Sequence, residues 1–184
     1  MARNYTVQVA DVHFQAVTVS IGVDNRAWLC SVVYASPTPS LREALWSHLT
    51  NFRQHALSPW LAVGDFNEIA LPTEVLGGDF SEARAARFLA MVEACEFMDL
   101  GAIGPTFTWE RRLNGRRTIA KRLDRALGDI SWRHNFPEAY VENLARFILI
   151  TALYWFVATQ RWRITQVAPS ASMQRGQRIL LLGL

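Results

Sequence analysis

Residues 60–69, WLAVGDFNEI, are the part of this sequence from which its architecture follows most directly. The apolar run Trp60–Val63 predicts a short buried strand, which ends at Gly64. Asp65 and Asn67 follow two positions apart, in a loop of the kind where ligands bind. A carboxylate there can hold a hard cation or a water, and an amide can orient a phosphate oxygen. An Asx-turn that only stabilises the strand end would give the same string.

Three strands are predicted ahead of this segment. Residues 5–12 and 14–21 alternate apolar and polar side chains, as half-buried strands do. Residues 27–35 are more continuously apolar, which predicts a central strand. A helix is expected next, with Ser40 as its N-cap in a capping box and its end near His55.

A second helix is predicted to begin after Ser81, and three short strands follow it at 106–110, 118–120 and 122–127. The string LNGR at 113–116 predicts a hairpin turn between the first two. This order of elements indicates a layered α/β or α+β domain. The side chains expected to be buried are Leu41, Leu45, Leu49, Phe52, Trp60, Ala85, Phe88, Leu89, Val92, Cys95, Trp109 and Leu123.

The chain has 184 residues, of which 51% are hydrophobic, enough for one globular domain with a sizeable core. Cys30 and Cys95 lie in apolar segments and are expected to be reduced core residues. No signal peptide is recognised, and the longest apolar run, residues 147–158, is shorter than the roughly 20 residues of a membrane span. These features predict an intracellular protein, in the nucleus or the cytoplasm, with no membrane partner.

The formal net charge of +3 is unevenly distributed. Residues 148–184 hold four arginines and no acidic residue, so they contribute +4 and residues 1–147 sum to −1. The basic pI is therefore weak evidence for nucleic-acid binding by the body of the chain. Five cations flank the expected hairpin and could contact phosphates, or could form an ordinary solvated face. They are Arg111, Arg112, Arg116, Arg117 and Lys121.

Other polar residues allow two interpretations each. Tyr34 ends an apolar strand, where its phenol could reach a phosphate, although a core tyrosine is the more common case. Arg122 and Asp124 fall on one face of a strand, where a surface ion pair is the simpler interpretation. The four histidines lack metal-ligand spacing and are expected to be structural. They are His13, His48, His55 and His134.

Six strings occur together in one order: VVYASP (32–37), WLAVGDFNEI (60–69), GGDF (77–80), FMDLGAIGPTFTWERR (97–112), KRLDRALGD (121–129) and W-x3-FPEAYVENL (132–144). In this order they resemble the endonuclease domain of plant LINE-type (non-LTR) retrotransposons. That domain belongs to the Mg²⁺-dependent endonuclease/exonuclease/phosphatase superfamily. The resemblance covers about residues 5–147, and the spacing of GDFNEI, FTW and RLDRAL is specific.

The resemblance implies a partial four-layer α/β sandwich that hydrolyses a DNA phosphodiester by in-line attack of a water, with Mg²⁺ and no small-molecule cofactor. It also implies roles for four residues. Asp65 would orient or deprotonate the water, and Asn67 would hydrogen-bond the phosphate or that water. Tyr34 would donate to the phosphate, and Asp124 would orient a catalytic histidine.

Two departures from the family pattern lead us to expect an inactive fragment. The family opens with strands bearing an Asn and the Glu that binds Mg²⁺, and this chain matches from after both, so no metal ligand is assigned. The family closes with Ser-Asp-His, whereas residues 146–156 read RFILITALYWF. The alternatives are an active enzyme completed by another segment, or a nucleic-acid-binding module without catalysis.

The genetic code offers an explanation for the second departure. Residues 147–156 can be encoded by codons that, read from the last base of the first codon, spell His-Ser-Asp-His-Cys-Pro-Leu-Leu-Val. Residues 167–176, shifted in the same way, permit Arg-Pro-Phe-Arg-Phe-x-Ala-Ala-Trp, which resembles the string downstream of this domain. We therefore expect a partial domain at 1–147 and an out-of-frame tail at 148–184. Residues 148–157 are still β-prone enough for a strand, and the remainder is expected to be unstructured.

This interpretation predicts a net loss of one base, or an equivalent change, near codon 147 of the gene. Sequencing the genomic DNA around that codon checks it. If the shifted frame does not spell Ser-Asp-His, the frameshift hypothesis is wrong.

Overall fold

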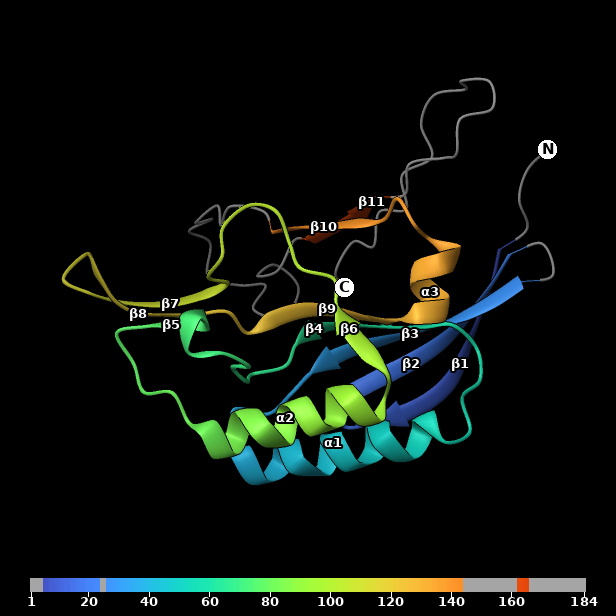
Figure 1. The fold of residues 1–184 in the computed structure, drawn as a ribbon, viewed down its shortest axis with the longest axis horizontal. Coiled ribbons are helices and arrows are strands. Elements are labelled where there is room, and N and C mark those ends of the chain that lie inside the picture. Colours follow the sequence, from blue (N-terminus) through green and yellow to red (C-terminus); the bar gives the residue numbers. More distant parts are fainter. Residues whose placement is uncertain (1–4, 24–25, 144–161, 166–184) are drawn as a thin grey trace, which may run out of the picture.

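The computed structural model describes residues 5–23, 26–143 and 162–165, and its centre is a six-stranded sheet (Figure 1). β3 and β4 are parallel, and the other neighbouring pairs are antiparallel. The strands predicted around residues 5–35 and 60–63 are confirmed, with small shifts at their ends. In order across the sheet, the strands are β1 (Tyr5–His13), β2 (Ala16–Val23), β3 (Arg26–Tyr34), β4 (Trp60–Asp65), β9 (Asp124–Asp129) and β6 (Phe97–Asp99).

Helices α1 (Pro39–Arg53) and α2 (Glu82–Ala94) cover one face of this sheet (Figure 1). α1 is the crossover that a parallel β3–β4 pair requires. Two predicted core residues are exposed instead, Leu41 to 45% and Leu89 to 43%. The buried positions of each helix recur at a spacing of three and four, and this places both leucines at the flank of the buried face. The residues buried there are Arg42, Leu45, Trp46, Leu49, Ala85, Phe88 and Met91.

The start of α1 differs from the sequence prediction. The N-cap is Thr38 rather than Ser40, its side chain makes no capping hydrogen bond, and Pro39 is the first helical residue. Proline suits that position because its fixed φ is already helical and its missing N–H would have no partner there. The start of α2 after Ser81 is as predicted.

A second hydrophobic cluster covers part of the opposite face, under α3 (Ile130–Asn135) and β10 (Tyr140–Asn143). Asp129 is the N-cap of α3 and also ties this helix to β4. Its Oδ1 accepts from the Trp132 amide at 2.7 Å, and its Oδ2 accepts from the Trp60 amide at 3.1 Å. β10 pairs with β11 (Trp162–Thr165), although the sequence predicted no strand after residue 157. The strand predicted at 148–157 lies outside the described residues, and the domain boundary at 147 stays a prediction.

A small second sheet contains the predicted hairpin. It joins β5 (Val75–Leu76), β8 (Arg116–Lys121) and β7 (Trp109–Leu113), after the 3₁₀ turn η1 (Pro72–Glu74). Asn114 and Gly115 have φ values of 50° and 76°, the left-handed conformation that a tight hairpin turn demands. Trp109 is 37% exposed, so its predicted burial is wrong, and its ring lies under the Lys121 ammonium instead.

The cysteines are core residues, as predicted. Cys30 and Cys95 are buried in different hydrophobic clusters on opposite faces of the sheet, so they form no disulfide. Burial raises the pKa of each thiol to about 12. No helix in the described part of the chain is long and apolar enough to cross a membrane.

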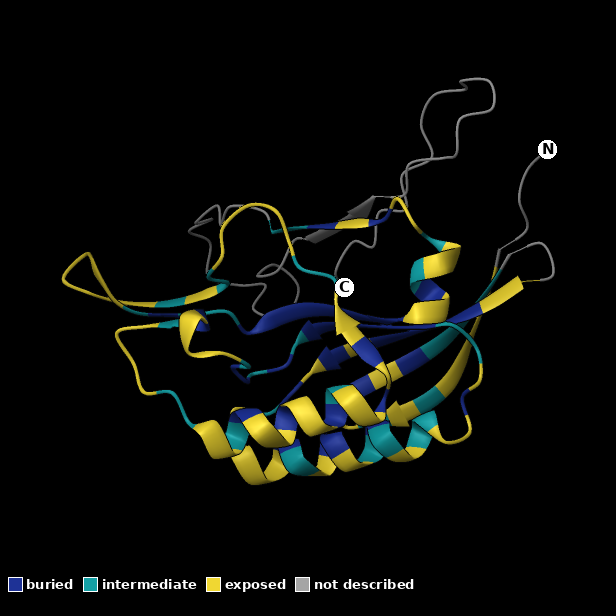
Figure 2. Ribbon diagram, viewed as in Figure 1, coloured by how far each residue is buried: buried dark blue, intermediate teal, exposed yellow. Residues whose placement is uncertain are grey.

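The outer strands expose apolar side chains on the face opposite α1 and α2. Val9 and Val17 point to this face, as do Trp28 and Cys30, because cross-strand partners share a side. α3 and β10 cover Trp28 and Cys30 but leave the valines exposed. Figure 2 shows β1 as largely exposed, in contrast to the buried central strands. The exposed members, called the open valine face below, are Val7, Val9, Val12, Val17 and Val32, at 41–66% exposure.

We expect the open valine face to cause self-association of the isolated chain, since contiguous exposed apolar surface favours association. Val9→Lys combined with Val17→Lys should lower the association measured by sedimentation velocity and leave the melting temperature within a few degrees of the parent. Val33→Lys, on the buried side of β3, is the control and should prevent folding. Equal association of the parent and the double variant would contradict this expectation.

Candidate functional site

Three of the four residues singled out by the resemblance lie in one row across neighbouring strands. Tyr34 of β3 is the register partner of Asp65 in β4, and Asp65 is the register partner of Asp124 in β9. Register partners point to the same side of a sheet, with Cβ atoms roughly 5 Å apart in an antiparallel pair. The row therefore presents a phenol and two carboxylates at one sheet end, on the face opposite α1 and α2.

Gly64 allows the backbones at this end to approach closely. Its φ is +139°, and a Cβ built on it would lie 1.9 Å from the Val33 carbonyl oxygen. Any side chain at this position would separate β3 from β4, next to Tyr34 and Asp65.

Asn67 completes the group from the loop that follows β4. Its φ of 49° is left-handed, which asparagine tolerates better than most residues. Its backbone amide donates to Asp65 Oδ1 at 2.7 Å, so the Asx-turn considered from the sequence is present. Its side-chain Nδ2 donates to the Ala35 carbonyl at 2.7 Å and to Asp65 Oδ2 at 3.3 Å. These bonds hold the amide against Asp65 and against the Ala35 carbonyl, one residue after Tyr34.

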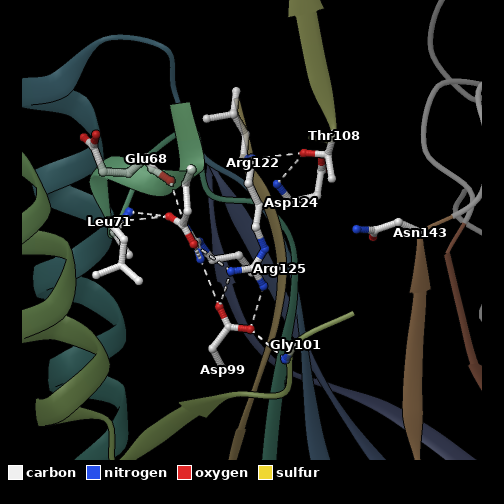
Figure 3. Close-up of polar contacts among 12 residues, drawn as sticks. Glu68, Leu71, Asp99, Gly101, Thr108, Arg122, Asp124, Arg125 and Asn143 are labelled. Carbon is white, nitrogen blue, oxygen red and sulfur yellow. Dashed lines mark hydrogen bonds and ion pairs between the residues drawn. The ribbon is translucent and has the colours of Figure 1, made fainter. Parts of the chain in front are cut away.

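Exposure falls steeply along the row. Tyr34 is 68% exposed, whereas Asp124 is only 7% exposed and borders a small pocket with Gly101 and Asn143. Thr108 Oγ1 accepts from the Asp124 backbone amide at 3.1 Å (Figure 3). This fixes the start of β9.

The ion pair considered between Arg122 and Asp124 is replaced by another arrangement. Arg122 contacts Glu74 and Asp99, at 2.8 Å to Glu74 Oε1 and 2.7 Å to Asp99 Oδ1. Arg125 contacts the same two carboxylates, and Figure 3 shows Arg122 and Arg125 converging on Asp99. Asp124 alternates to the opposite face of β9 from Arg125, whose guanidinium lies over the Phe88 ring of α2.

Sequence reasoning missed this network, because Glu74 and Asp99 belong to short segments without periodicity. Burial raises the pKa of Glu74, but hydrogen bonds and charge from Arg125 and Arg122 outweigh it and hold the pKa below its ordinary value. The same balance of burial against Arg122 lowers the pKa of Asp99. Both carboxylates are therefore ionised at neutral pH and join η1, β6 and β9.

The five hairpin cations differ in the contacts that they make. Arg112 and Arg117 both bind Glu110, at 2.6 and 2.9 Å, and hydrogen bonding from Arg112 is the main cause that lowers the pKa of Glu110. Arg111 and Arg116 are exposed. The five cations together still form a positive surface, partly offset by one carboxylate.

Two of the four histidines, His13 and His48, form one cluster with Asp11 where β1 meets α1, and the structural assignment of all four stays a prediction. His48 Nε2 lies 2.6 Å from Asp11 Oδ2, and the His13 ring stacks on His48 at 4.6 Å. Within the described ranges, no group of three or more His, Cys, Asp or Glu is placed to hold a metal ion.

Comparisons with solved structures show which known fold this chain has. The endonuclease domain of TRAS1, a telomere-specific non-LTR retrotransposon, matches with a TM-score of 0.59 and 17% identity over 76% of this chain and 62% of that one. Beta toxin 275-280 from Staphylococcus aureus matches with a TM-score of 0.53 and 13% identity, over 77% of this chain and 56% of the toxin. The chain has the endonuclease/exonuclease/phosphatase fold.

A variant of the 3′ phosphatase NExo from Neisseria, bound to product DNA hairpin, has the same fold, with a TM-score of 0.51 and 15% identity over 76% of this chain and 63% of that one. The chain thus spans 56–63% of the length of these three structures. No family model and no curated protein matches the sequence. The fold class predicted from the sequence, including the retrotransposon-type endonuclease likeness, is confirmed at the level of fold.

The lowered pKa values of Glu74 and Asp99 predict acid sensitivity. A carboxylate with a depressed folded-state pKa contributes stability above its unfolded pKa and loses it as pH falls through the folded value. We expect the melting temperature to fall below about pH 4, the ordinary range of carboxyl groups. Glu74→Gln should melt lower at neutral pH and respond less to acid. Parallel melting-temperature profiles for parent and variant, measured by calorimetry, would show that Glu74 contributes nothing to the acid response.

Proposed function

We propose that this chain is part of a Mg²⁺-dependent DNA endonuclease of a LINE-type retrotransposon, of the kind found in plants. The observation that best supports the proposal is the row of Tyr34, Asp65 and Asp124, with Asn67 beside it, in a fold shared with nucleases. The resemblance in sequence singles out these four residues, and the strand register brings them together at one sheet end.

The chemistry of these groups suits phosphodiester hydrolysis. Asp65 is a carboxylate able to orient or deprotonate a water, and Asn67 Nδ2 would donate to a phosphate oxygen in exchange for its longer bond, at 3.3 Å, to Asp65 Oδ2. Tyr34 presents an exposed phenol, a second donor for that phosphate. Asp124, buried at the other end of the row, is suited to orienting a positively charged or imidazole partner rather than to contacting solvent.

The carboxylate oxygens of Asp65 are hard donors of the type that Mg²⁺ prefers. Mg²⁺ is commonly held by one or two carboxylates together with water and substrate phosphate, so the Glu of the resembling domains would be needed to complete the site. When bound, the ion would neutralise charge on the phosphate.

DNA is the proposed partner, and the β7–β8 hairpin is its proposed contact. Arg111, Arg112, Arg116, Arg117 and Lys121 project from a two-stranded ribbon joined by β8 to η1 and β5, next to the loop that carries Asn67. Cations on such a ribbon bind phosphates without sequence preference. A nuclease acting on chromosomal DNA works inside the cell, in keeping with the intracellular location expected from the sequence.

We further propose that the chain does not cleave DNA by itself. Residues 146–156 contain neither aspartate nor histidine, where the resembling domains carry Ser-Asp-His. Without that histidine the phosphate loses a donor, and loss of one such donor costs roughly 10²–10³ in rate. The alternatives are an active enzyme completed by another segment and a binding module without catalysis.

A plasmid-nicking assay tests the catalytic assignment. The chain as given should not nick supercoiled plasmid in Mg²⁺ above background. A longer chain that carries the shifted-frame sequence from residue 147, preceded by the resembling domain's Asn and Glu strands, should nick it. Asp65→Ala in that longer chain should abolish nicking, whereas Asp79→Ala, in the loop before α2, is the matched control and should not. Nicking by the given chain that Asp65→Ala removes would overturn the proposed inactivity.

DNA binding, measured in parallel, distinguishes an endonuclease from the alternative of a binding module without catalysis. Replacing Arg111 and Arg116 with Gln should weaken binding uniformly across sequences and lower the slope of log K against log salt by about 0.9 per lost phosphate contact. Binding with no nicking by the longer chain would favour the module.

A further inference from the structure

Two buried arginines lie beneath the loop that carries Asn67, and neither belongs to the row. The first is Arg42 of α1, whose side chain is 4% exposed. Its Nη1 donates to the Ser36 and Pro37 carbonyls at 2.8 and 2.9 Å, and its Nη2 to Glu68 Oε2 at 2.6 Å. Arg42 thus joins the segment that follows Tyr34 to the loop that follows Asp65.

The second is Arg125, whose side chain is 1% exposed. Its Nη1 donates to Glu74 Oε1 and Asp99 Oδ2, each at 2.9 Å, and its Nη2 contacts the Glu68 carbonyl at 3.4 Å. Arg125 is the residue after Asp124, so it joins the start of β9 to the same loop from the other side (Figure 3).

The loop is shaped by the two carboxylates that these arginines hold. Glu74 Oε2 accepts from the Ala70 amide at 2.7 Å and from the Leu71 amide at 3.2 Å. Glu68 Oε1 accepts from the Ile69 amide at 3.2 Å. Each carboxylate therefore turns toward the loop backbone on one side and toward an arginine on the other.

Stability is a weak reason for such buried pairs, because desolvation offsets most of the attraction and apolar replacements are often as stable. A guanidinium provides geometry instead, since its planar fork fixes several acceptors at once. Arg125 also lies over Phe88, on the helix side of the sheet, and so cannot touch a ligand at the row.

We propose that Arg42 and Arg125 are positioning residues, which together hold the loop bearing Asn67 at a fixed place between the strand ends bearing Tyr34 and Asp124. The proposal rests on the proposed function for the use of that site. Its structural content, the coupling of three strand ends through two guanidinium groups, is measurable without any catalysis.

Arg53 provides a matched control. It is a partly buried arginine, 18% exposed, with two carboxylate partners, Asp129 and Glu96, and Asp129 lies at the far end of β9 from Asp124. Removing its guanidinium deletes a comparable set of contacts away from the site.

The test is amide hydrogen exchange by mass spectrometry on the full 184-residue chain at low concentration. Arg125→Met should speed exchange in residues 66–71 at least about tenfold, relative to peptides from β2, which Arg125 does not contact. Arg42→Met should do the same, and Arg53→Met should leave residues 66–71 at the parental rate. Arg125→Lys, which keeps the charge but not the fork, should fall between Arg125→Met and the parent.

Parental exchange at 66–71 in Arg125→Met, or an equal rise in Arg53→Met, would overturn the proposal. If the methionine variants do not fold, Arg125→Lys against Arg53→Lys decides by the same criterion. The proposed function fails separately, through absence of DNA binding or of nicking by the longer chain, and neither result alters the exchange comparison.

Discussion

The register of three adjacent strands is the constraint on which the site depends. Side chains alternate along a strand, so a slip of one residue in β9 would turn Asp124 toward the helices and bring a neighbour into the row. β4 prevents such slips because it is buried on both faces, with Trp60 and Ala62 in one hydrophobic cluster and Leu61 and Val63 in the other. The packing of this strand therefore specifies the place of Asp65.

Coverage of the sheet is uneven, and the row lies at the boundary. Helices α1 and α2 close one face, whereas α3 and β10 close only part of the other. Asp124 falls in the covered half, and Tyr34 falls beside the open valine face. A phosphate ligand would therefore meet solvent-exposed donors at one end of the row and a desolvated carboxylate at the other. The two carboxylates of the row, Asp65 and Asp124, therefore have different surroundings, and under the proposed function this difference would separate a group that contacts the ligand from one that orients it.

The sequence predicted the long elements and the members of the row, because periodicity and specific strings carry that information. It did not predict β6 or α3, which are short and depend on tertiary contacts such as the cap made by Asp129. It placed Trp109 in the core because indole rings are usually buried, whereas here the ring pairs with Lys121 on a ribbon. The buried network around Arg125 was also invisible, since its carboxylates lie 51 and 26 positions away in the chain. Local pattern cannot reveal such partners, which only the folded topology brings together.

Gly64 makes the site sensitive to mutation at a position that itself has no reactive group. Nearly every base change in the first two positions of a glycine codon introduces a side chain, and here any side chain collides with the Val33 backbone. A single base change in that codon would therefore disturb the strand end even where the codons of Tyr34, Asp65 and Asp124 are intact. Asn67, three residues on, has a left-handed φ that most other side chains tolerate less well. The geometry of the row thus depends on two residues whose own side chains or backbone conformation, rather than their reactivity, are what the site requires.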